Sequence, residues 1–165
     1  MYLSHKAVHA MFQPDKKHDG QYDKMPIVRP PSMYLTATDS SKYFGIQQGP
    51  QTPVNYADIP KWVRNQRYSW HGVDQMYDGD MQFDTFYRKY CETLLSVDES
   101  IGRVMQWLKE HNLDKNTLVI YMGDNGFQFG EHGLIDKRDM YEASMRVPLL
   151  AWCPDLIKPG TKVKQ

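Results

Sequence analysis

The most regular hydrophobic pattern in this 165-residue chain runs from Asp84 to Asn112. Apolar side chains recur there at intervals of three and four residues, which is the spacing of one face of an α-helix. The positions are Phe86, Tyr90, Leu94, Val97, Ile101, Val104 and Leu108. Gly102 interrupts this stripe, and we expect it to mark a close packing contact or a break between two helices. Asn112 suits the end of the helix, because asparagine tolerates the left-handed backbone of a C-terminal cap.

A continuous apolar run, Leu118 to Met122, follows the predicted helix after a short turn. Its length and its β-branched and aromatic residues predict a strand that is buried on both faces of a parallel sheet. The run ends at residues 123–126, Gly-Asp-Asn-Gly, a sequence typical of a tight turn. A second apolar run, Val147 to Trp152, follows a short helical stretch near Asp139 to Met145. A helix followed closely by a strand is half of a β-α-β crossover, so we predict a layered α/β fold.

Polar side chains gather just beyond the carboxyl end of the first predicted strand, where ligands bind in open α/β sheets. Asp124 and Asn125 offer a carboxylate and an amide oxygen, which are hard ligands suited to Ca²⁺ or Mg²⁺. Lys137 adds a compact positive charge that can meet an anionic oxygen. A divalent cation and a lysine at one place indicate a tetrahedral oxyanion, either phosphate or sulfate. From spacing alone, a turn without any ligand is an equal alternative, because such turns are common.

The composition argues against several classes of function. Lys plus Arg and Asp plus Glu each number 20, so the formal net charge is zero. This balance gives no electrostatic basis for binding nucleic acid or an anionic membrane. The chain has no apolar run of about 18 residues, the length that a membrane-spanning helix needs. Its two cysteines, Cys91 and Cys153, define no disulfide framework, and its length suits one domain rather than two.

The segment GDNGFQFGEHGLIDKRDMYEASMRVPLL, residues 123–150, resembles the part of sulfatases that carries one half of a calcium site and the sulfate-binding lysine. It shares with the family the Asp-Asn-Gly turn, the Gly-Glu-His-Gly loop, the lysine and the stretch around RVPLL. The resemblance implies that Asp124 and Asn125 are calcium ligands and that Lys137 contacts the sulfate group. His132 falls in the family's loop, whose role varies among members, and is a secondary candidate for substrate binding.

The same resemblance makes two further histidines candidates for contact with the substrate. The sequence MYLSHKAVHAMF at residues 1–12 is similar to a sulfatase segment in which a histidine contacts the sulfate ester, and His9 occupies that position. Met11 replaces a proline that is typical of the family. His71, in the sequence Trp-His-Gly-Val, lies in a stretch that resembles carbohydrate sulfatases of the N-acetylglucosamine-6-sulfatase kind. A structural role is the favoured interpretation of His71, and contact with the sugar is the alternative.

The resemblance implies an alkaline-phosphatase-like α/β fold with a mostly parallel central sheet, only partly contained in this chain. Residues 1–165 are then a partial sulfatase catalytic domain, with a loop-rich, proline-interrupted insert at 13–80 and a helix-strand-loop-strand core at 84–152. The implied cofactor is Ca²⁺, and the implied nucleophile is a formylglycine made within a Cys-x-Pro-x-Arg or Ser-x-Pro-x-Arg sequence. Neither Cys91 nor Cys153 stands in such a sequence. We therefore expect an internal fragment, inactive alone, whose nucleophile and further aspartates lie upstream.

The implied function is hydrolysis of a sulfate ester on a sulfated small molecule or glycan. A phosphomonoesterase or phosphonate hydrolase of the same superfamily is the first alternative, although those enzymes more often carry histidine at the position of Asn125 and bind two transition metals. A non-catalytic, truncated remnant is the second alternative. The first residues show neither a charged n-region nor a long apolar h-region, so we expect no signal peptide in them. The family as a whole is mostly periplasmic, extracellular or lysosomal.

Overall fold

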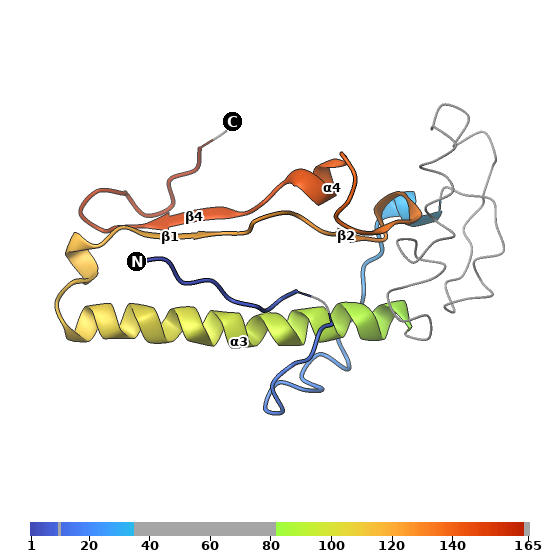
Figure 1. Ribbon diagram of the computed structural model, residues 1–165, viewed down its shortest axis with the longest axis horizontal. Coiled ribbons are helices and arrows are strands. Elements are labelled where there is room, and N and C mark those ends of the chain that lie inside the picture. Colours follow the sequence, from blue (N-terminus) through green and yellow to red (C-terminus); the bar gives the residue numbers. More distant parts are fainter. Residues whose placement is uncertain (10, 35–81, 164–165) are drawn as a thin grey trace.

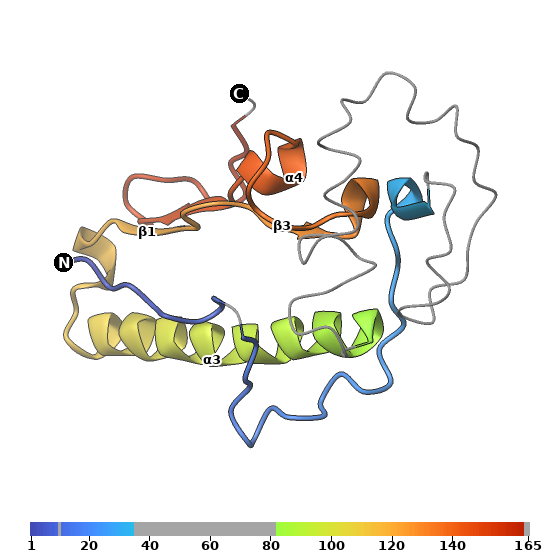
Figure 2. The ribbon, with the colours of Figure 1, turned by 45° about the vertical axis from the view of Figure 1, so that its right-hand side comes forward.

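The computed structural model describes residues 1–9, 11–34 and 82–163. Helix α3 (Phe83–Glu110) forms one layer and two pairs of short strands form another, as Figures 1 and 2 show. The strands are β1 (Val119–Met122), β2 (Gln128–Phe129), β3 (Ile135–Asp136) and β4 (Leu149–Trp152). The remaining elements are the short helices η1 (Pro31–Tyr34), η3 (Asp114–Asn116), η4 (Glu131–Gly133) and α4 (Glu142–Met145). Residues 1–9 run alongside α3, to which the His5 ring is joined by a 2.9 Å hydrogen bond between Nε2 and Ser100 Oγ.

Helix α3 confirms the helix predicted from the apolar stripe. It ends as expected, because Asn112 has a φ of 55° and its N–H donates to Lys109 O at 3.1 Å. The expectation for Gly102 is wrong. The helix continues through Gly102, which is exposed, and an added Cβ would meet no described atom within 4 Å. No helix in the described part of the chain combines the length and apolar character needed to cross a membrane.

An aromatic core joins α3 to the strands and to the early part of the chain. Met33, Phe83, Phe86 and Ile135 are buried at its centre, and Phe12, Ile27, Phe127 and Phe129 pack against them. The ring centroids of Phe12 and Phe86 lie 4.9 Å apart, and those of Tyr90 and Phe129 lie 4.6 Å apart. Because such ring pairs stabilise a fold beyond the area that they bury, this core fixes the loop after β1 against α3.

A buried carboxylate fastens residues 15–25 to the same helix. Glu92 is fully buried, and its two oxygens meet the Tyr22 N–H at 3.1 Å and the Lys89 Nζ at 3.1 Å. Lys89 also pairs with Asp19, and this hydrogen bond is the main cause of a raised Lys89 pKa. The carboxylate is therefore paired and hydrogen-bonded, as a buried charge must be.

The strand pairing corrects one expectation. Strand β1 pairs antiparallel with β4, in the register Val119↔Trp152 to Met122↔Leu149, and no parallel pair occurs among the described strands. Nor is β1 buried on both faces, since Ile120 and Met122 are 55% and 58% exposed. Burial of both faces needs a layer on each side of the sheet, and the described residues supply α3 on one side only. The mixed helix and strand layers still agree with the predicted α/β class.

Candidate functional site

The turn after β1 presents Asp124 and Asn125 next to each other. Asp124 is exposed, and its Oδ1 accepts the backbone N–H of Asn125 at 3.0 Å. Asn125 is half-buried, and its Nδ2 donates to Gly126 O at 2.7 Å. Because this bond fixes which end of the amide carries the nitrogen, the Asn125 Oδ1 faces away from the turn. That oxygen accepts a 3.1 Å hydrogen bond from Lys137 Nζ.

Gly126 holds this turn against α4. Its N–H donates to Ser144 O at 2.8 Å. A Cβ at Gly126 would lie 2.1 Å from Ala143 O and 2.6 Å from Arg146 O, which are backbone atoms that cannot turn away. Only glycine allows the two backbones to approach so closely. The sequence indicated a turn at this glycine, but the contact with α4 appears only in the folded chain.

Lys137 follows strand β3, whose pairing with β2 fixes the backbone up to Asp136 in the register Gln128↔Asp136. The carboxylate of Asp136 is buried and forms an ion pair with Arg138, so charged partners flank Lys137 on both sides. Lys137 itself is half-buried. Its ammonium and the amide of Asn125, twelve residues apart, are thus brought together as the sequence predicted.

The Gly-Glu-His-Gly loop turns through three residues with positive φ: Gly130 at 99°, His132 at 57° and Gly133 at 73°. The Gly130 N–H closes the loop on Leu134 O at 2.9 Å. Glu131 has a local role, because its Oε2 accepts the Phe129 N–H at 2.6 Å. This carboxylate therefore stabilises the loop that carries His132.

His132 is held by two residues that the sequence did not single out. Its backbone N–H donates to Ser32 Oγ at 3.1 Å, and its ring stacks on Tyr141 with the centroids 3.9 Å apart and the planes 16° apart. Ser32 lies 100 positions away in the chain, and no local sequence pattern predicts such a contact. Tyr141 lies within residues 123–150, the segment that resembles sulfatases, but no pattern in that segment predicts its stacking on His132.

Burial favours the neutral form of the His132 ring. Burial lowers the pKa of the imidazole below its ordinary value, and the carboxylates of Asp139 and Glu131 oppose part of that shift. Burial also raises the pKa of the Asp139 carboxyl, while the N–H of Tyr141, 3.0 Å from Asp139 Oδ1, opposes that change. At neutral pH the stacked ring is therefore an uncharged hydrogen-bonding group.

The other two histidines lie elsewhere. His9 is exposed in a turn closed by its N–H and Lys6 O at 2.9 Å, on the segment that His5 joins to α3. His71 lies outside the described residues. The structure thus joins Asn125 and Lys137 directly and places Asp124 and the His132 loop in the same segment, while His9 comes from a separate part of the chain.

The donor set at the turn fits a hard cation. Ca²⁺ takes about six to eight oxygen ligands, and Asp124 and Asn125 offer a carboxylate and an amide oxygen. Within residues 1–9, 11–34 and 82–163, no group of three or more His, Cys, Asp or Glu side chains gathers as a metal site. Asp124 and Asn125 thus offer two oxygens of the kind that such a cation prefers.

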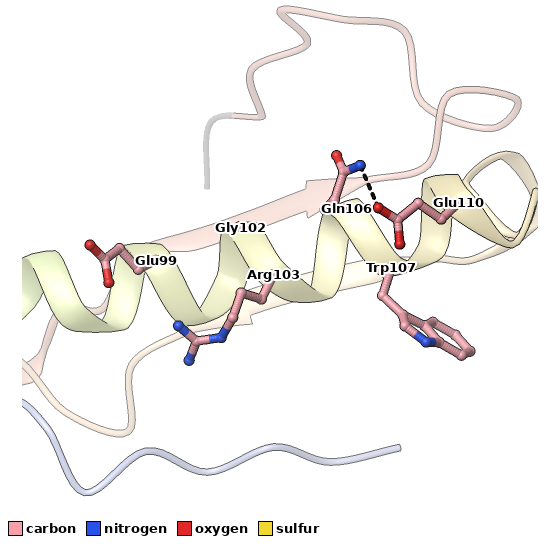
Figure 3. A pocket seen from close by; sticks show the side chains of 6 residues that line it. All are labelled: Glu99, Gly102, Arg103, Gln106, Trp107 and Glu110. Atoms are coloured by element: carbon pink, nitrogen blue, oxygen red, sulfur yellow. Dashed lines mark hydrogen bonds between the residues drawn. The ribbon is translucent and has the colours of Figure 1, made fainter.

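A separate depression of about 500 Å³ lies on α3 (Figure 3). It is lined by Glu99, Gly102, Arg103, Gln106, Trp107 and Glu110, all from that helix. Gln106 donates to Glu110 at 2.8 Å within it. The depression shares no residue with the turn after β1 and brings none of the predicted site residues together.

Comparisons with known proteins agree with the resemblance of residues 123–150 to sulfatases. The family model for sulfatases matches residues 1–165. The chain is 42% identical over 80 residues to the N-acetylglucosamine-6-O-sulfatase of Bacteroides thetaiotaomicron, covering 48% of this chain and 14% of that protein. It is 35% identical over 113 residues to human N-acetylglucosamine-6-sulfatase, covering 61% of this chain and 20% of that protein.

A solved structure extends the similarity to the fold. The structure of BT4656 in complex with its substrate D-glucosamine-2-N,6-O-disulfate matches with a TM-score of 0.61 and 25% sequence identity, covering 93% of this chain and 38% of that one. The sequence matches to the two curated relatives span 14% and 20% of their lengths. The described layers thus correspond to part of a larger known fold.

Proposed function

The chain belongs to the sulfatase family, and we propose that it supplies calcium- and sulfate-binding residues for the hydrolysis of a sulfate ester. The observation that carries this proposal is the 3.1 Å hydrogen bond between Lys137 Nζ and Asn125 Oδ1. It brings a lysine ammonium to the same amide that, with Asp124, fits a hard cation. Two adjacent positive centres would suit the tetrahedral, negatively charged sulfate group.

We further propose that the substrate is a carbohydrate sulfate, with the ester on the 6-position of a glucosamine-type sugar. The names of the two curated relatives and the substrate of the solved neighbour support this choice. The neutral, stacked His132 ring, only partly buried, would suit contact with an uncharged part of such a sugar. If His71 has no structural role, its side chain would be a second group that contacts the sugar.

Asp124 and Asn125 would hold part of the Ca²⁺ site. When bound, the cation would supply positive charge that neutralises the sulfate oxygens. Asn125 Nδ2 donates to Gly126 O, and this bond leaves the amide oxygen directed toward Lys137. The resemblance also implies a formylglycine nucleophile, and neither Cys91 nor Cys153 stands in the sequence from which it is made.

The chain's own residues would act on the bond between sulfur and the sugar oxygen. Lys137 would stabilise negative charge that grows on the sulfuryl oxygens as this bond breaks. His9 would donate a hydrogen bond to the departing sugar oxygen and transfer a proton to it, so that the sugar leaves as a neutral alcohol. The oxygen of the attacking nucleophile would stay bonded to the sulfur.

Lys137→Ala tests the proposal. In the full-length enzyme, it should lower kcat for N-acetylglucosamine-6-sulfate by about 10²–10³-fold, as loss of one preorganised charge-stabilising group does. Release of inorganic sulfate gives the rate. Lys115→Ala is the matched control, because that exposed lysine lies in η3, away from the turn.

The same assay separates the alternatives. Hydrolysis of the sulfate ester with no hydrolysis of the matching 6-phosphate supports a sulfatase, and the reverse preference supports a phosphomonoesterase. Near-normal turnover by the Lys137→Ala enzyme would remove Lys137 from the mechanism. Absence of turnover with both esters by the unaltered full-length protein would favour a non-catalytic remnant.

A further inference from the structure

Asp136 adopts a backbone conformation that its side chain does not favour. It has a φ of 112°, in a region where an L-residue is strained and where glycine is the ordinary choice. Its carboxylate is also almost fully buried, with 2% of the residue exposed. Both features have an energetic cost, so the Asp136 side chain must make an interaction that a glycine would lack.

One such interaction is an ion pair with Arg138, two residues further along the chain. The pair spans Lys137, whose ammonium extends to Asn125 Oδ1 at 3.1 Å. Two cations thus follow the buried carboxylate in the sequence, and the structure assigns the arginine to it. Arginine suits this role because its planar guanidinium matches a carboxylate better than an ammonium does.

We propose that the Asp136–Arg138 ion pair positions Lys137 toward Asn125 and the sulfate ester. Arg138 neutralises Asp136, and Lys137 is therefore not drawn back to the carboxylate beside it. Without Arg138, the buried carboxylate would lack that compensating charge, and the ammonium of Lys137 would be the adjacent replacement. Arg138 is a positioning residue in this scheme. The inference rests on the proposed function, which assigns Lys137 to the ester.

Arg138→Met in the full-length enzyme tests the inference. It should lower kcat by about 10-fold to 100-fold, as small displacements of a catalytic group do, and by a larger factor than it raises KM. Arg138→Lys should restore most of the lost kcat, because it keeps a cation next to Asp136. Affinity for inorganic sulfate, measured by calorimetry, should fall and recover in the same order.

A double variant distinguishes a loss of positioning from simple misfolding. Asp136→Asn removes the charge that needs a partner, and asparagine accepts a positive φ more readily than most residues. Asp136→Asn combined with Arg138→Met should therefore recover kcat relative to Arg138→Met alone. Arg146→Met is the matched control, because that exposed arginine pairs with exposed Glu142 at 3.6 Å and should leave kcat unchanged.

Three results would overturn the inference. The first is a raised KM with unchanged kcat in Arg138→Met, which would place Arg138 on the substrate itself. The second is a double variant no better than Arg138→Met. The third is an equal effect of Arg138→Met in the Lys137→Ala background, measured by sulfate affinity, which would show that Arg138 does not act through Lys137. The proposed function survives all three, whereas full activity of Lys137→Ala alone would remove it.

Discussion

Helix α3 and the loop between β1 and α4 differ in what determines their backbone conformation. Hydrogen bonds between nearby residues determine that of the helix, whereas the loop also depends on contacts with distant segments. Helix α3 is regular over 28 residues, and its backbone hydrogen bonds lie within the helix. The loop takes four positive φ values between Gly130 and Asp136, and its contacts reach Ser32 and α4. The backbone of α3 thus forms from local hydrogen bonds, whereas the loop that carries the candidate chemistry depends on distant segments.

Two glycines make the difference concrete. An added Cβ at Gly102, in α3, meets no described atom within 4 Å, whereas at Gly126, in the loop, it would lie 2.1 Å from Ala143 O. The same residue type is a weak point of a helix in one region and a spatial requirement in the other. Substituting each glycine by alanine therefore tests whether the two regions differ as the structure indicates.

Gly126→Ala should have the largest effect. The clash with α4 should lower the free energy of unfolding by about 1–3 kcal/mol, as overpacking does. Displacement of the turn should also weaken calcium binding, if Asp124 and Asn125 are ligands. Chemical denaturation and calcium calorimetry on the full-length protein measure the two effects.

Gly123→Ala provides the matched control for that change, because its Cβ would lie 3.4 Å from Asn125 O, close to an ordinary contact. Equal effects of the two substitutions would contradict the assigned role of the α4 contact.

Gly102→Ala should have a smaller effect of opposite sign. Alanine reduces the conformational freedom of the unfolded chain and favours the helix, so the free energy of unfolding should rise by about 0.5–1 kcal/mol. Turnover should be unaltered, since Gly102 lies on the exposed face of α3. A loss of stability measured by thermal denaturation would mean that this face is covered in the full-length protein.

The smallest expected effect concerns pH. The pKa of His132 is lowered by burial from an ordinary value of 6.5. The neutral ring is thus favoured in the fold, and its contribution to stability is present above pH 6.5 and lost as pH falls through the lower folded value. Partial exposure keeps the effect small.

His132→Asn should flatten this pH dependence of the unfolding free energy, because asparagine accepts the positive φ and does not titrate. Denaturation curves recorded at several pH values between 5 and 8 compare the variant with the unaltered protein. An unchanged dependence would show that another group titrates in this range.

Local pattern was sufficient for α3, for its end at Asn112, for β1 and β4, and for the helical stretch at α4. It was also sufficient for the turn at Asp124 and Asn125 and for the expectation that Lys137 lies close to this turn, where the structure has a hydrogen bond to Asn125. Their roles toward calcium and sulfate stay predictions. The failures were the parallel pairing of β1 and the packing role of Gly102, since both depend on what lies opposite in space.

The sequence by itself determined where α3, β1, β4, the helical stretch at α4 and the turn after β1 lie, because hydrophobic period and turn residues act over a few positions. Only the tertiary structure decided that Gly126 touches α4, that His132 is held by Ser32 and Tyr141, and that Asp136 takes Arg138 as its partner. These contacts depend on backbones and charges brought together by the aromatic core on α3. Such contacts leave no period in a sequence, because packing in the folded chain decides them, even for Asp136 and Arg138, which are only two residues apart.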